Sequence, residues 1–303
     1  MNKVRWDRTP LHYLIAVTGV SMALIILNFL LGRRIPFTVH FLIGFVGSLL
    51  VFMVWHAWLT LGWKRSLLMF GSSFAIALSA EALGVNYGLI FGGYHYTGFL
   101  GLRLFGVPIL TALAWEPVLY ASFWLTALLS PSSGALSGSG SAGLRSYAWP
   151  ALIGAFAATA WDIVIDPVAV SQGWWVWHEG GLYVADLKNG VPIQNFFGWL
   201  GVAFIILLLY HVIAGPAARI RHSRSLSIHG PLALYSALVL TSCGVAVTLL
   251  PRPQVAVSGM VAMAPILVVA LYNVRRMQPG RESRPETEGP QPGVRKRLRR
   301  IQE

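Results

Sequence analysis

Charged residues are scarce in this chain, and cysteine is almost absent. Of its 303 residues only 11% are charged, 55% are hydrophobic, and the mean hydropathy is +0.63. This composition excludes a soluble globular protein and predicts a polytopic membrane protein. The single cysteine, Cys243, excludes an internal disulfide and a cysteine-based metal cluster.

Motifs for metals and nucleotides are missing as well. The eight histidines include no pair spaced three or four residues apart, which is the spacing that helical metal sites use. The chain also has no glycine-rich phosphate loop and no serine nucleophile motif. We therefore expect no bound metal and no cofactor, which argues against a membrane di-iron hydroxylase or desaturase.

Long apolar runs dominate the sequence. A helix needs about 20 apolar residues to cross a bilayer, and eight windows of about that length occur. The prediction is an all-α polytopic membrane bundle of about eight transmembrane helices within residues 1–276. The windows are 11–31, 37–61, 66–90, 107–129, 148–170, 193–214, 231–250 and 255–273.

Lysine and arginine fall mainly on one side of this predicted topology. If the spans alternate, 18 of the 23 basic residues lie on the side that holds both termini. The positive-inside rule then predicts that both termini are cytoplasmic in a multi-pass protein of the cell membrane. Residues 277–303 form a basic, weakly apolar tail that we expect to be disordered and to meet anionic lipid, with no role in binding nucleic acid.

Four carboxylates interrupt the apolar windows. They are Glu81, Glu116, Asp162 and Asp166, and each costs about 2.5 to 3.5 kcal/mol at bilayer depth on insertion scales. The predicted topology places all four in the outer half, and Asp162 and Asp166 share a helix face, where they should titrate as a coupled unit. The sequence therefore predicts a functional site built on these acids.

Aromatic residues and glycines gather in two outer loops beside these acids, at residues 84–98 and 173–180. Aromatic rings with a polar edge suit the boundary between membrane and water. We predict that these loops, with nearby positions in the spans, bind substrate. The candidates are Tyr94, His95, Tyr96, Trp115, Trp161, Trp174, Trp175, Trp177 and Asn195.

A short internal echo suggests a duplicated unit. Gly106-Val107-Pro108-Ile109 precedes Trp115 just as Gly190-Val191-Pro192-Ile193 precedes Trp199, and the two copies lie 84 residues apart. Each copy begins an inward helix that follows an aromatic loop and, before that loop, an outward helix with an acid near its end, Glu81 in the first case and Asp166 in the second. We infer a tandem repeat, which would make spans three to six, at about residues 66–214, the functional bundle.

Several of these pieces resemble the CruF-type carotenoid hydratase family, whose members are carotenoid biosynthesis membrane proteins. The resemblance covers about residues 40–250. It rests on Glu81 with the loop at 94–96, the entry at 106–108, Trp161-Asp162, Asp166-Pro167 and the cluster at 174–177. It implies hydration of the terminal 1,2 (or 1',2') double bond of an acyclic carotenoid end, as in lycopene, gamma-carotene or a C50 precursor of bacterioruberin. Other carotenoid-pathway membrane enzymes would be possible partners.

The resemblance suits the chemistry of the acids. Alkene hydration needs a strong proton donor, a stabilised tertiary carbocation and a base that captures water. We assign proton transfer to Asp162 and Asp166, with Glu116 and Glu81 orienting water or sharing the proton. Indole faces can stabilise the cation by cation–π attraction.

Two other functions stay open. Asp162-x-x-x-Asp166 also matches the second aspartate motif of UbiA-type prenyltransferases, although the first motif of those enzymes is missing here. Acids beside prolines in spans are equally expected in a proton-coupled transporter.

Overall fold

The structure is a computed structural model that describes residues 9–31, 39–129, 144–178, 183–184, 190–214, 224–250 and 254–277. The predicted tail, apart from its first residue, lies outside these ranges, as do the last two residues of the second aromatic loop. The sidedness of the termini therefore stays a prediction.

Eight long helices form the bundle in the part of the chain that the structure describes, and the predicted all-α membrane fold is confirmed. All eight are long and apolar enough to cross a membrane, so this is a multi-pass membrane protein. α5 and α7 begin before their apolar windows because polar residues continue the helix beyond the apolar segment. The helices are α1 (Thr9–Leu30), α2 (Val39–Thr60), α3 (Trp63–Tyr87), α4 (Ile109–Leu129), α5 (Leu144–Ser171), α6 (Ile193–Ala214), α7 (Arg224–Leu249) and α8 (Gln254–Met277).

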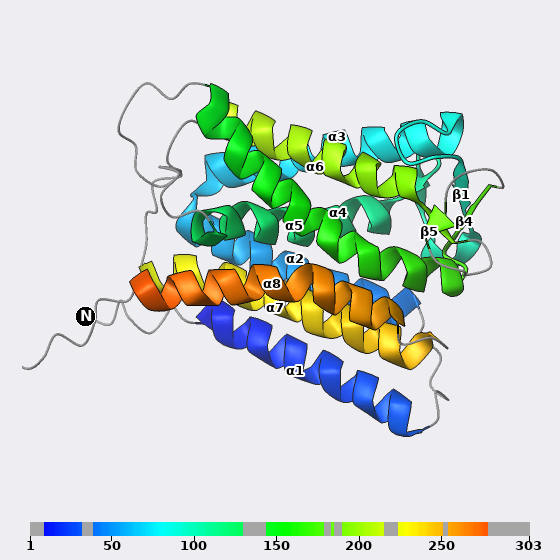
Figure 1. Ribbon diagram of the computed structural model, residues 1–303, viewed down its shortest axis with the longest axis horizontal. Helices are drawn as coiled ribbons and strands as arrows, with labels where there is room; N and C mark the ends of the chain where they lie inside the picture. The colour runs from blue at the N-terminus through cyan, green and yellow to red at the C-terminus, as the bar shows by residue number, and fades with distance from the viewer. Residues whose placement is uncertain are drawn as a thin grey trace, which may run out of the picture.

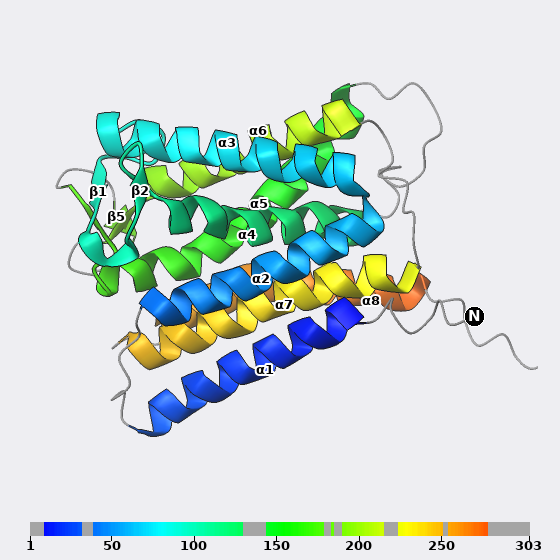
Figure 2. The same cartoon turned by 180° about the vertical axis from the view of Figure 1, so that it is seen from behind.

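α4 is the central helix. Within its apolar window 83% of the residues are buried, against 22% in α1 and 28% in α8. It contacts α2, α3, α5, α7 and α8. Figures 1 and 2 show it between α3 and α6 on one side of the bundle and α1, α7 and α8 on the other. The buried carboxylates are carried by α4 and by the helices packed against it.

Short strands close one end of the bundle, which we call the strand end. β1 (Tyr94–Tyr96) pairs antiparallel with β4 (Trp175–Trp177), with Tyr94 opposite Trp177 and Tyr96 opposite Trp175. β2 (Arg103–Leu104) pairs with β3 (Val107–Pro108), and β5 (Tyr183–Val184) pairs with β6 (Val191–Pro192). Figure 1 shows β1, β4 and β5 together, at the opposite end of the bundle from the first residues of α1. Both aromatic loops are thereby brought into one ladder.

The two predicted repeat units have the same order of elements. The first runs from α3 through β1, β2 and β3 to α4, and the second from α5 through β4, β5 and β6 to α6. The equivalent residues Trp115 and Trp199 stack face to face, with ring centroids 3.6 Å apart and planes 4° apart. Counted back from the strands, the acid that corresponds to Glu81 is Asp162 and not Asp166, because Glu81 lies 13 residues before the start of β1 and Asp162 lies 13 residues before the start of β4. The repeat therefore places one acid from each unit near a shared centre.

Close helix packing depends on a glycine in α8. A Cβ built on Gly259 would lie 1.9 Å from Cγ2 of Val164 on α5, whereas one built on Gly71 of α3 meets no atom within 4 Å. We expect Gly259→Ala to force α8 away from α5 and to lower stability by about 1 to 3 kcal/mol, the usual cost of overpacking. Thermal unfolding of the detergent-solubilised protein measures this. Gly71→Ala is the control, and equal midpoints for the two variants would contradict the expectation.

Candidate active site

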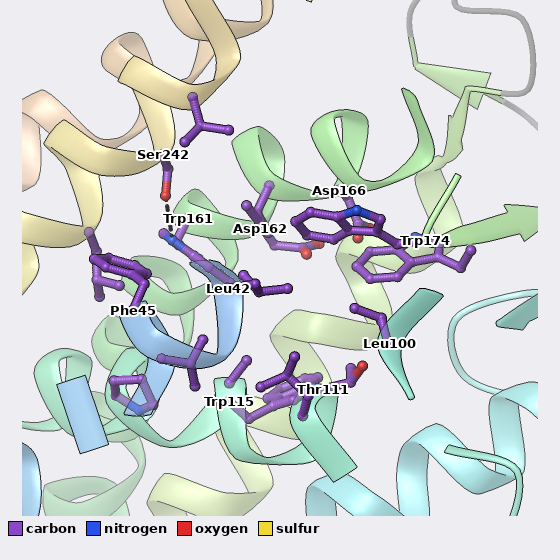
Figure 3. A pocket seen from close by; sticks show the side chains of 18 of the residues that line it. Leu42, Phe45, Leu100, Thr111, Trp115, Trp161, Asp162, Asp166, Trp174 and Ser242 are labelled. Atoms are coloured by element: carbon purple, nitrogen blue, oxygen red, sulfur yellow. Dashed lines mark hydrogen bonds between the residues drawn. The ribbon is translucent and has the colours of Figure 1, made fainter. Parts of the chain in front are cut away.

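A largely apolar cavity in the strand-end half of the bundle contains most of the predicted site. Three of the four predicted acids line it, namely Glu81 of α3 and both Asp162 and Asp166 of α5. Figure 3 shows the two aspartates on neighbouring turns of α5, with Trp174 and Leu100 beyond them and Trp161 on the other side. The cavity thus joins acids from both repeat units.

Glu81 is held by three hydrogen-bond donors. The hydroxyl of Tyr96 donates to Oε2 over 2.7 Å, the hydroxyl of Tyr94 donates to the same oxygen, and Nε1 of Trp115 donates to Oε1 over 2.9 Å. Because successive strand residues point to opposite faces, Tyr94 and Tyr96 both face inward from β1. Both carboxylate oxygens act only as acceptors in this arrangement. It is the hydrogen-bonding pattern of a fixed anion.

The two tyrosines are well suited to stay protonated donors. Burial raises the pKa of Tyr94 well above its usual value of 10.0, and the nearby Glu81 carboxylate raises it further. The pKa of Tyr96 is raised well above its usual value by the same two causes in the same order. Each phenolate would be desolvated and would face another negative charge. The Glu81 site therefore keeps its donors across the physiological pH range.

Asp162 and Asp166 are bridged by one amide. Nδ2 of Asn195, on α6, donates to Oδ2 of Asp162 over 2.8 Å and also to Oδ2 of Asp166. The side-chain amide has two hydrogens, so each carboxyl group receives one. Oδ1 of Asp162 is buried, and no donor among the described residues reaches it. This second acid site has fewer donors than the Glu81 site and has a free position for a proton.

Glu116 does not join the other acids. Ser73 Oγ, on α3, bonds to both of its oxygens over 2.8 and 2.7 Å, and Glu116 is not among the residues that line the cavity. The prediction that all four carboxylates meet is therefore wrong for this residue. Each helix residue turns by about 100°, so the face of α4 that carries Thr111 and Trp115 into the cavity points Glu116 toward the opposite side. The sequence predicted the depth of Glu116 in the membrane, but it did not predict the direction in which this side chain points from α4.

His95 also lies away from the cavity. It is the central residue of β1, between two inward tyrosines, and strand alternation turns it outward. Its Nδ1 lies 3.3 Å from Nε2 of His178, and the two rings stack with centroids 5.5 Å apart. The structure thus places His95 in a contact between the two loops and not against the cavity.

The predicted aromatic residues do line the cavity. Nε1 of Trp161 donates to Oγ of Ser242 over 2.9 Å, which fixes the ring between α5 and α7. Sequence reasoning missed Trp199, although its 84-residue offset from Trp115 could have found it. The wall also extends beyond residues 66–214, through Ser21 and Ile25 of α1, Leu42 and Phe45 of α2, and Leu238 and Ser242 of α7. The predicted tryptophans in the wall are Trp115, Trp161, Trp174, Trp175 and Trp177.

Comparison with known proteins identifies the family. A family model described as carotenoid biosynthesis protein matches residues 37–265. The chain belongs to this family. The match confirms the resemblance to carotenoid biosynthesis membrane proteins seen in the sequence and supports a role in carotenoid biosynthesis. The Glu81 and Asp162/Asp166 sites both fall within the matched region.

One curated relative of this chain carries a more specific name. The chain is 30% identical over 133 residues to a bisanhydrobacterioruberin hydratase of Haloarcula japonica. The matched segment is 43% of this chain and spans only 39% of that relative's length. No solved structure matches the chain.

The buried tyrosines give a test of the Glu81 site. We expect the folded Tyr94→Phe/Tyr96→Phe variant to form as much tyrosinate as the wild-type protein when both are titrated through the usual pKa of 10.0. The reason is that the two removed hydroxyls do not ionise in this range. Ultraviolet difference absorbance measures tyrosinate. In denaturant, where burial is lost, the variant should instead form less tyrosinate than the wild-type protein. Less tyrosinate in the folded variant than in the folded wild-type protein would contradict the assignment.

Proposed function

We propose that this protein is a carotenoid hydratase that adds water to the terminal 1,2 double bond of an acyclic carotenoid end. The observation that carries the proposal is the asymmetric pair of acid sites in one apolar cavity. Asp162 and Asp166 share a single amide donor, whereas Glu81 is bound by three donors. One site can therefore deliver a proton, and the other can remain an anion.

The first step is protonation of the alkene. The π electrons of the terminal double bond take a proton from the Asp162/Asp166 pair and form a C–H bond at the less substituted carbon. The positive charge is then left on the tertiary carbon, and the aspartate pair becomes one charge more negative. Two neighbouring carboxyl groups that titrate as a coupled unit can hold this proton between them. Oδ1 of Asp162, which has no donor among the described residues, is the free position for it.

The cation is stabilised by its surroundings. The indole faces of the cavity attract positive charge through their π electrons. Glu81 adds a carboxylate whose position is fixed by Tyr94, Tyr96 and Trp115 before the reaction begins. Preorganised charge of this kind is worth more in an apolar cavity of low dielectric than in solution.

Water capture completes the reaction. A lone pair of water forms the C–O bond to the tertiary carbon, and the proton that the water loses returns to the aspartate pair. The net change is the addition of one water, so the acid is regenerated. The chemistry has no oxidation step and no leaving group. The name of the Haloarcula relative supports this reaction class, and lycopene, gamma-carotene or a C50 bacterioruberin precursor are the candidate substrates.

A prenyltransferase is less well supported. A diphosphate substrate would need basic residues near the aspartates, and Arg103 instead donates to the backbone carbonyls of Tyr96, over 2.9 Å, and Thr97. The charged side chains in the described cavity wall are all acidic. A transporter is disfavoured by family membership in carotenoid biosynthesis.

Replacing either aspartate tests the proton-transfer assignment. We expect Asp162→Asn and Asp166→Asn each to lower hydration by about 10² to 10⁴-fold, the usual contribution of a general acid or base. Pigments from lycopene-producing cells grown in H₂¹⁸O are analysed by mass, since label from water identifies hydration. Equal amounts of each variant in the membrane are the control. Wild-type levels of labelled product in both variants would refute the assignment.

The position of Glu116 gives a matched comparison. We expect Glu116→Gln to keep the product yield per folded protein, because its side chain meets Ser73 outside the cavity. Glu81→Gln should lower the yield sharply, because it removes the fixed negative charge while keeping the size of the side chain. The same pigment assay measures both variants. A large loss of product in a normally folded Glu116→Gln variant would show that this residue takes part in the reaction.

A further inference from the structure

The cavity has two ends of different chemistry. One end holds the acid sites with Tyr94, Tyr96 and Trp174, and the other is formed by α1, α2 and α7. Figure 3 shows Trp174 and Leu100 beyond the aspartates in one direction, and Trp161, Ser242 and Phe45 in the other. We call the second part the apolar arm and define it by Ile25, Leu42, Phe45, Leu238, Thr241 and Ser242.

The walls of the apolar arm present almost only hydrocarbon. Its large side chains are aliphatic or aromatic, and although Ser21 of α1 lines the cavity nearby, the two hydroxyl residues of the arm itself are already hydrogen-bonded. Oγ of Ser242 accepts from Trp161, and Oγ1 of Thr241 donates to the carbonyl of Ala237 over 2.5 Å. An occupant of the arm therefore gains little from polar groups and much from apolar contact.

A row of aromatic rings connects the acid sites to this arm. Trp115 donates a hydrogen bond to Glu81 and stacks on Trp199, with their ring centroids 3.6 Å apart. The ring centroid of Trp199 lies 5.9 Å from that of Trp161, which in turn donates a hydrogen bond to Ser242. Flat rings offer extended faces to a planar conjugated chain. The row begins beside the proposed reaction centre and ends at α7, so a chain that follows it would pass out of the acid site into the arm.

The arm ends beside two of the three least buried helices of the bundle. α1 and α2 have 22% and 33% of their apolar windows buried. On these helices the arm residues alternate with large apolar residues on the outer surface. Ile25 is 6% exposed beside Leu24 at 42%, and Leu42 is partly buried beside Ile43 at 51%. The arm is thus separated from lipid by a single layer of helix.

We propose that the apolar arm holds the conjugated polyene chain of the substrate and admits it from the bilayer beside α1 and α2. This inference rests on the proposed function and extends it by assigning the route and the residues that select the substrate. A long, narrow polyene whose only branches are methyl groups would lie between α2 and α7 while its end reaches the aspartates. The arm would then select substrates by the shape of the polyene chain behind the reacting end.

Tryptophan substitutions inside and outside the arm test this proposal. Leu42→Trp and Ile25→Trp place a bulky ring in the arm, and Ile43→Trp and Leu24→Trp place the same ring on the outer surface of the same helices. Each protein is purified from lycopene-containing membranes. The polyene that stays bound is measured by its absorbance, the hydrated product by mass, and folding by the thermal midpoint.

We expect both inward variants to lose bound polyene and product by about fivefold or more, the effect of an overpacking cost of about 1 kcal/mol or more on binding, while both outward variants match the wild type. Undiminished bound polyene in the two inward variants would overturn the arm as the binding route, and so would wild-type protein that carries none. Polyene that binds in an arm-dependent way but is never hydrated would overturn the proposed function and leave the binding route in place.

Discussion

The need to satisfy carboxylates inside an apolar bundle constrains the rest of this structure. A buried charge without donors is far too costly to keep, so each acid draws a partner from another element. Glu81 of α3 is bound by two tyrosines of β1 and by Trp115 of α4. Asp162 and Asp166 of α5 are bound by Asn195 of α6. These bonds join the helices of each repeat unit at the depth where the cavity lies.

The repeat explains how two acid sites come to share one cavity. Antiparallel pairing of β1 with β4 and the stacking of Trp115 on Trp199 bring the two units face to face. Glu81 and Asp162 occupy matching places before their strands. Their partners differ, with three donors on one acid and one shared amide on the other pair. This difference between matching halves is the physical basis for assigning a fixed anion to one unit and proton transfer to the other.

The spans could be predicted because apolar length is a local property of the chain. The same holds for the aromatic loops and for the 84-residue echo. Glu116 and His95 were misplaced because depth and loop membership do not state the direction of a side chain. Rotation of α4 turns Glu116 toward Ser73, and alternation in β1 turns His95 toward His178. Trp199 lies 84 residues after Trp115, so the repeat could have identified it as a site residue from the sequence.

The sequence by itself determined the membrane class, the eight helices and the presence of costly acids, since each follows from composition along a single segment. Tertiary structure alone decided which acids meet, that Asn195 bridges two of them, and that α1, α2 and α7 extend the cavity. These features depend on helix rotation and on which faces pack together. Such choices are made by contacts between distant segments, so no single window of the sequence contains them.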